Sequence, residues 1–213
     1  MWQTSDNSLT SNIKKHTDWV TSVSYSHDGV LLATADRNGG LYIWEAESGN
    51  PFHNLRGHQK QIVSLKWSPD SNYLASASED GKVRVWNMNS GKEIRKIDAH
   101  NAGVLDMDWS KKGLLITVGR DRRIKLWKSD YNLLKEIKYE GSMPTKVEWT
   151  HDGNRFITTD FNGQIFVWDS KSHQKKGKLL ANPLSLTGRI VLATKALNEK
   201  QLIGQKKKAG FDH

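Results

Sequence analysis

The sequence of 213 residues contains no cysteine. The chain therefore cannot form a disulfide scaffold, bind a metal through thiolates, use a cysteine nucleophile or attach a c-type haem covalently. Long apolar runs are also missing, because the longest is Ile190–Ala193, far short of the ~20 residues that a membrane helix needs. Met1–Asp6 has neither the basic start nor the apolar stretch of a secretory signal. These absences favour a cytoplasmic protein, whereas a preceding segment with a signal would place it in the periplasm.

Positive charge is concentrated at the C-terminal end. The net charge is +9, and residues 171–213 hold ten Lys and Arg against two acidic residues, a balance of +8. Residues 1–170 are left with 22 basic and 21 acidic groups, a balance of +1. A near-neutral body lacks the basic face that nucleic-acid binding needs. The distribution thus disfavours nucleic acid or a membrane surface as a partner.

Three residue types recur with a period of about 41 residues. One tryptophan series is spaced by 42, 41 and 41 residues: Trp44, Trp86, Trp127 and Trp168. A second aromatic series is spaced by 42, 42 and 40 residues: Tyr25, Trp67, Trp109 and Trp149. The histidines at 16, 58 and 100 are 42 residues apart. Such agreement indicates an internal repeat of four units.

Each unit has the pattern of about four short antiparallel strands. Apolar residues alternate before each late Trp, as in Val83-Arg84-Val85-Trp86, which is typical of strands with one buried face. Asn38-Gly39, Asp80-Gly81 and Asn162-Gly163 indicate tight hairpins in three units, whereas the third has Asp121-Arg122. We expect outer strands after each late Trp: Phe52–Leu55, Glu93–Ile97, Leu133–Ile137 and Lys178–Ala181. A further outer strand is predicted near residues 9–14.

These residues resemble the WD-repeat β-propeller family, whose pattern is a Gly-His step, a Ser/Thr-x-x-x-Asp step and a closing Trp. The second unit has all of them: Gly57-His58, Ser76, Asp80 and Trp86. The resemblance covers residues 8–182 and implies an all-β fold of four propeller blades. A narrower resemblance, through His16–Val20 and Asp36–Gly40, is to bacterial WD-repeat proteins. Some of those follow a c-type haem domain, for which this chain has no Cys-x-x-Cys-His.

The resemblance implies a hydrogen-bonded group of side chains in each blade, with a structural role rather than a catalytic or metal-binding one. Asn38 and Asn162 replace the acid in the first and fourth units, and the fourth lacks the histidine. The implied tetrad residues are His16, Thr34, Asn38 and Trp44; His58, Ser76, Asp80 and Trp86; His100, Thr117, Asp121 and Trp127; and Thr158, Asn162 and Trp168. No metal, cofactor or catalytic residue is expected.

Four repeats raise the question of ring closure. We expect a domain of residues 1–183 with blades near 16–57, 58–99, 100–140 and 141–182, followed by a basic tail at 184–213. The additional strand near 9–14 favours an incomplete ring or part of a larger one, although a closed ring of four blades stays possible. An open ring would be completed by another propeller segment or by self-association. In the tail, Leu186, Ile190, Ala193 and Leu197 form an amphipathic helical stripe.

The predicted function is a non-catalytic scaffold for protein–protein interaction. The resemblance places loop residues on one rim around the propeller channel, and their composition suits an interface. The rim residues are Trp19, Arg37, Gln61, Val63, Glu79, Leu105, Arg120, Met143 and Phe161. An alternative is a regulatory or docking propeller within a larger, haem-containing bacterial protein whose activity lies upstream.

An enzyme is disfavoured because the motifs of catalysis are missing. The sequence has no Gly-x-Ser-x-Gly, no phosphate-binding loop and no His-Glu-x-x-His. His27 and His151 occupy equivalent turns and are expected to be exposed. Asp36–Gly39 and Asp160–Gly163 faintly resemble calcium loops but lack the other ligands.

Overall fold

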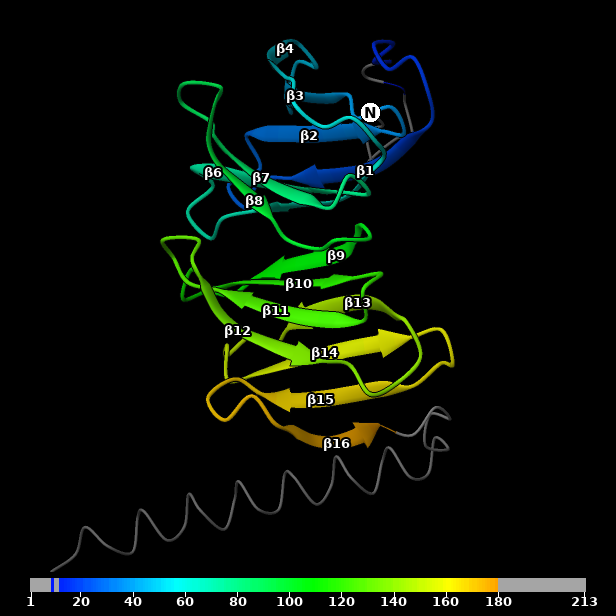
Figure 1. Cartoon of the computed structure of the whole chain (residues 1–213). Coiled ribbons are helices and arrows are strands. Elements are labelled where there is room, and N and C mark those ends of the chain that lie inside the picture. Colours follow the sequence, from blue (N-terminus) through cyan, green and yellow to red (C-terminus); the bar gives the residue numbers. More distant parts are fainter. Residues whose placement is uncertain (1–8, 10–11, 180–213) are drawn as a thin grey trace, which may run out of the picture. The chain divides into compact units, whose positions relative to one another are not determined.

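The computed structural model describes residue 9 and residues 12–179, which form four separate four-stranded antiparallel sheets. Figure 1 shows the sheets following one another along the chain, from blue to orange. In each sheet the strands lie side by side in chain order. The predicted all-β class and its four four-stranded units are therefore confirmed. The tail predicted at 184–213 lies outside the described residues.

The strand bounds follow the repeat. The first sheet contains β1 (Val20–Tyr25), β2 (Leu31–Asp36), β3 (Leu41–Glu45) and β4 (Pro51–Leu55). The second contains β5 (Ile62–Trp67), β6 (Tyr73–Ser78), β7 (Lys82–Asn87) and β8 (Lys92–Asp98). The third contains β9 (Val104–Trp109), β10 (Leu115–Gly119), β11 (Arg123–Trp127) and β12 (Leu133–Lys138). The fourth contains β13 (Pro144–Trp149), β14 (Arg155–Asp160), β15 (Ile165–Asp169) and β16 (Lys175–Leu179).

The hairpin between the second and third strands of each sheet needs one residue with positive φ. Gly39, Gly81 and Gly163 fill this position with φ of 86°, 85° and 69°, a region that glycine enters without steric cost. In the third sheet the position belongs to Arg122, with φ of 59°. The unusual Asp121-Arg122 turn therefore keeps the geometry of its counterparts without their glycine.

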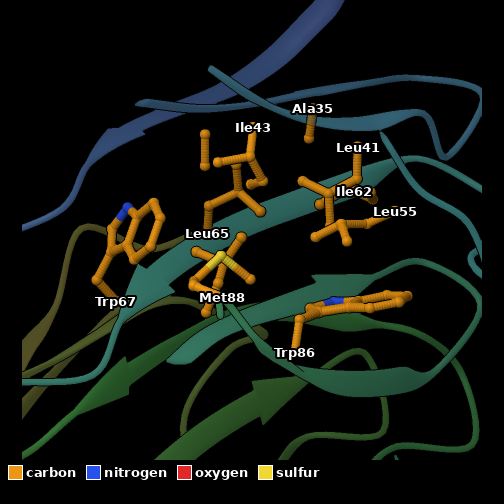
Figure 2. Packing of buried hydrophobic residues seen from close by; sticks show 11 residues of the cluster. Ala35, Leu41, Ile43, Leu55, Ile62, Leu65, Trp67, Trp86 and Met88 are labelled. Carbon is orange, nitrogen blue, oxygen red and sulfur yellow. The ribbon is translucent and has the colours of Figure 1, made fainter. Parts of the chain in front are cut away.

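Hydrophobic cores lie between consecutive sheets. Figure 2 shows the core between the first two sheets, where Ile43 of β3 approaches Leu65 of β5 and Trp86 closes one side. Two further cores join the second sheet to the third and the third to the fourth. Between the strands of the described chain, close packing of sheet on sheet joins consecutive sheets only. A single sheet thus buries its faces only by stacking on its neighbours.

The expected strand near residues 9–14 falls partly outside the described residues. Leu9 forms an isolated β-bridge, and residues 12–16 have no regular secondary structure. Residues 12–15 line a small hollow together with Trp44 and Pro51. This segment therefore lies beside the outer part of the first sheet.

Candidate functional site

In the second and third sheets, a buried histidine links a hydroxyl to a turn carboxylate. His58 lies 2.9 Å from both Ser76 Oγ and Asp80 Oδ2. His100 lies 2.9 Å from Thr117 Oγ1 and 2.8 Å from Asp121 Oδ1. The indoles complete each chain, because Trp86 and Trp127 donate to the same hydroxyls at 2.9 and 3.1 Å. The structure thus brings each of these two predicted tetrads together.

In the first sheet the acid is Asp36, not Asn38 as predicted. His16 Nδ1 lies 2.7 Å from Asp36 Oδ2, while His16 Nε2 lies 2.7 Å from Thr34 Oγ1. Trp44 donates to the same Thr34 hydroxyl at 2.8 Å. Asn38 only donates its backbone N–H to Asp36 Oδ1, at 3.0 Å. In this sheet the acid stands two residues earlier in the sequence than in the second and third sheets, and its carboxylate still reaches the hairpin turn.

The fourth sheet repeats this displacement and replaces the histidine. Trp168 donates to Thr158 Oγ1 at 2.9 Å, and Asp160 rather than the predicted Asn162 carries the turn carboxylate, accepting the Asn162 N–H at 3.0 Å. Tyr139, 1% exposed, stands beside these residues. Burial, and then the negative charge of Asp160, raise the pKa of the Tyr139 phenol. Tyr139 therefore brings a phenol to the place where the other sheets have an imidazole.

One repeated backbone hydrogen bond joins the two rim loops of each sheet, and all but one of the bonded residues are predicted rim residues, the exception being Gly103. Each bond connects the loop before an inner strand to the hairpin after the second strand of the same sheet. The N–H of Arg37 donates to Trp19, Glu79 to Gln61, Arg120 to Gly103 and Phe161 to Met143, at 3.0, 2.9, 3.0 and 3.2 Å. The two loops of every sheet thus present their side chains at one end.

The rim residues differ widely in exposure. Trp19 is 75% exposed and Phe161 66% exposed, and the Arg37 guanidinium lies 5.6 Å from the centre of the Trp19 ring. Arg120 is exposed and pairs with Glu79 of the preceding sheet at 2.5 Å. The remaining predicted residues are partly buried: Gln61, Val63, Leu105 and Met143. Val63 and Leu105 pack against the cores between sheets.

A comparison with protein-family models matches the WD domain, G-beta repeat, four times, at residues 7–45, 49–87, 91–128 and 135–169. These matches cover well over half of the chain, and each includes one hydroxyl–indole pair of the kind described above. The chain belongs to the WD40 repeat family. A search of curated proteins gives no match. WD40 repeats generally act as non-catalytic scaffolds for protein–protein interaction.

The WD40 repeats are offset from the sheets. The match at 49–87 begins before β4, which pairs with β3 of the first sheet, and ends with the third strand of the second. Each matched repeat after the first therefore supplies the outer strand of one sheet and three strands of the next.

His58 and His100 are buried, and both ring nitrogens of each have a side-chain partner. Burial lowers the pKa of His100, against the opposing effect of Asp121. Burial alone would raise the pKa of Asp80, but the hydrogen bond with His58 and the turn N–H groups lower it to about 2. Within the described part of the chain, no three His, Cys, Asp or Glu side chains are grouped to hold a metal ion. Asp36 and Asp160 instead accept the backbone N–H groups of their own turns.

Residues of the four inner strands, together with Ile157 and Thr159 of β14, line a cavity of about 550 Å³. Asp106, 4% exposed, accepts the Val147 N–H at 3.1 Å, and Asp108 accepts that of Trp149 at 2.7 Å. Lys146 and Lys66 lie 3.5 and 3.1 Å from these two carboxylates. The aspartates of β9 therefore satisfy backbone donors of β13.

No described helix has the length and apolarity needed to cross a membrane.

Sequence reasoning missed Asp36, Asp160 and Tyr139. The usable signal was that Asp precedes Asn-Gly by two residues in both the first and the fourth units. Asp106 and Asp108 were also missed, because alternation of residue types predicts a strand but not which backbone groups of a neighbouring sheet its side chains reach.

Proposed function

We propose that the rim formed by the paired loops of the four sheets docks a protein partner, with Trp19, Arg37, Arg120 and Phe161 as its anchors. The observation that carries the proposal is the exposure of two large aromatic side chains, Trp19 and Phe161, on equivalent ends of different sheets. Aromatic and Arg side chains are the residue types that most often dominate binding energy at interfaces.

Trp19 and Arg37 form the better-defined half of this surface. Asp18 caps the Trp19 N–H at 2.7 Å, and the Arg37 N–H is bound to the Trp19 carbonyl at 3.0 Å. The guanidinium lies near the face of the exposed indole. Because both backbones are fixed, binding of a partner here costs little backbone entropy, and the remaining cost is the ordering of the two side chains.

Arg120 and Phe161 extend the surface to the third and fourth sheets. Arg120 keeps an exposed position through its ion pair with Glu79, which joins two neighbouring hairpins. Phe161 follows the buried Asp160, whose carboxylate holds the hairpin through the N–H groups of Asn162 and Gln164. A partner with apolar and acidic side chains would match this combination of aromatic and cationic groups.

The test is affinity capture with the full chain, followed by quantitative mass spectrometry. One bait is wild type, and a second carries Trp19→Ala, Arg37→Ala, Arg120→Ala and Phe161→Ala. We expect the second bait to lose at least one reproducible partner by about tenfold or more, because its anchors are removed while its fold is kept.

A matched control removes comparable exposed apolar surface elsewhere. Phe52→Ala and Leu133→Ala truncate side chains that are 43% and 47% exposed on outer strands. This bait should retain the partners of wild type. Identical partner profiles for the wild-type and rim baits, with both folded by circular dichroism, would rule out the rim as the docking surface.

A further inference from the structure

Three times in this chain, the same apolar face of one sheet is covered by the next sheet. We call it the trailing face, made from the second, third and fourth strands. The residues of the first two trailing faces are no more than 6% exposed: Ala33, Ala35, Leu41, Ile43 and Leu55; Ala75, Ala77, Val83, Val85 and Ile97. In the third, Ile116, Val118, Ile124 and Leu126 are fully buried and Ile137 is partly buried.

Among the described strands, no sheet covers the equivalent face of the fourth sheet. Ile157 pairs with Val167, as Ala33 pairs with Ile43, and Ile165 pairs with Leu179, as Leu41 pairs with Leu55. The residues of this fourth trailing face are Ile157, Thr159, Ile165, Val167 and Leu179. Leu179 is 47% exposed, and the other four are partly exposed. An apolar face with a fixed shape is thus left open to solvent.

The surface that covers a trailing face is the leading face, which is centred on the first strand of the next sheet. In β5 it consists of Ile62, Leu65 and Trp67, at most 4% exposed. The equivalent residues of β1 are Val20, Val23 and Tyr25, which are 50%, 58% and 52% exposed. Register makes the equivalence explicit, because Tyr25 pairs with Leu32 as Trp67 pairs with Leu74. The first sheet therefore exposes the inner part of its leading face.

We propose that a second copy of this chain covers both faces, so that the trailing face of each copy packs on the leading face of the other. The occupant follows from the chain itself, since its three internal interfaces each join one trailing face to one leading face. A second copy offers both missing partners at once. Two such junctions related by a two-fold axis close a ring of eight sheets, within the range of sizes that propellers adopt.

The loops at the rim agree with this pairing. The hairpins of the second and third sheets meet through the ion pair of Glu79 and Arg120. The equivalent hairpin residues at the new junction are Phe161 of one copy and Arg37 of the other. An aromatic ring beside a guanidinium that already lies over Trp19 is a favourable combination. The proposed docking rim would then continue from one copy to the other.

The mass of the full chain in solution is the first test. Analytical ultracentrifugation should give about twice the chain mass of 24.2 kDa. A monomer over the whole concentration range would overturn the proposal. That is the result expected if another segment of the same chain covers these faces. Larger open assemblies would overturn the closed two-fold arrangement.

A charge-swap experiment tests which faces meet. In the first two sheets Leu65 approaches Ile43 (Figure 2), so Val23 should meet Val167 of the other copy. Val23→Lys alone and Val167→Glu alone each bury unpaired charges at both junctions, and should weaken self-association by about tenfold or more. An equal mixture forms one junction with Lys facing Glu and one wild-type junction, and should recover the dimer.

The single variants distinguish this arrangement from one in which like faces meet. If two leading faces met each other, Val167→Glu would leave the dimer unchanged, and that result would overturn the proposal. Ile94→Lys is the matched control, because Ile94 is 46% exposed on the outer strand β8 and should leave the mass unchanged. Circular dichroism of each variant identifies any that fails to fold, and an unfolded variant is replaced by Val20→Lys or Ile157→Glu. None of these changes touches the rim anchors, so partner capture fails or succeeds separately.

Discussion

The Nδ1 atom of His16 lies 2.7 Å from Oδ2 of Asp36, a residue at the end of β2 rather than in the hairpin turn. In the second and third sheets this strand position holds Ser78 and Gly119, as the pairing with the first strand shows. The second and third sheets therefore have a small residue at the end of the second strand and the acid in the turn. The first sheet has the acid at the end of the strand and Asn38 in the turn. Both arrangements let one carboxylate accept from a histidine and from turn N–H groups.

Replacing Asp36 by Ala should cost about 2 kcal/mol or more of unfolding free energy. The carboxylate is 1% exposed and bonds the His16 imidazole and the N–H groups of Asn38 and Gly40, which would all lose their acceptor. Asn38→Ala should cost much less, about 0.5 kcal/mol or below, because its side chain takes no part. Urea denaturation of both variants measures the difference, and equal costs would contradict the assignment.

The repeat period predicted how many sheets form and where their strands lie, but not which atoms complete the buried networks. The predicted outer strands Phe52–Leu55 and Glu93–Ile97 lie within β4 (Pro51–Leu55) and β8 (Lys92–Asp98). Alternation and turn residues determine these elements locally. Asp36 and Asn38, in contrast, are both short polar residues near one turn, and only the backbone path decides which of them faces His16.

Stability should decrease at acid pH in part through Asp80. The His58 hydrogen bond and turn N–H groups outweigh the cost of burial and lower the Asp80 pKa from 3.8 to about 2. A lower pKa in the folded state means that the stabilisation is complete above about pH 4 and is lost as the pH falls toward 2. After allowance for solvent screening at this partly exposed turn, we expect about 1 kcal/mol.

The measurement compares wild type with Asp80→Asn in urea denaturation across pH. The free energies of unfolding should differ by a constant amount from about pH 5 to pH 7 and converge below about pH 4. A difference that does not depend on pH would show that the Asp80 carboxyl has the same pKa in the folded and unfolded chain.

The left-handed backbone of Arg122 should carry a measurable strain. Its φ is 59° where the other three sheets have glycine, and its guanidinium donates to the Gly141 carbonyl at 2.7 Å. Arg122→Gly and Arg122→Ala both lose that bond, but only Gly relieves the backbone. The free energy of unfolding of the Gly variant should therefore be about 1 kcal/mol higher than that of the Ala variant. At Arg120, where φ is not positive, the same pair should show the opposite order.

The exposure of β1 follows from the incomplete ring and not from the residue pattern of the strand itself. Val20, Val23 and Tyr25 match Ile62, Leu65 and Trp67 in apolar type and in spacing, so the pattern predicts a buried face for both strands. Burial depends on a neighbouring sheet, which a pattern within one strand does not report. The same reasoning applies to Leu179, whose counterparts Leu55 and Ile97 are buried.

Gly119 should tolerate no side chain, because the His100 ring occupies the space. A Cβ atom there would lie 2.3 Å from His100 Cγ and 2.5 Å from Nδ1, and the ring is held in place by Thr117 and Asp121. Gly119→Ala should lower the free energy of unfolding by about 2 kcal/mol. Gly177→Ala is the control, since no atom lies within 4 Å of its added Cβ, and it should change stability by less than about 0.5 kcal/mol. Similar denaturation midpoints for the two variants would show that the His100 ring moves aside at little cost.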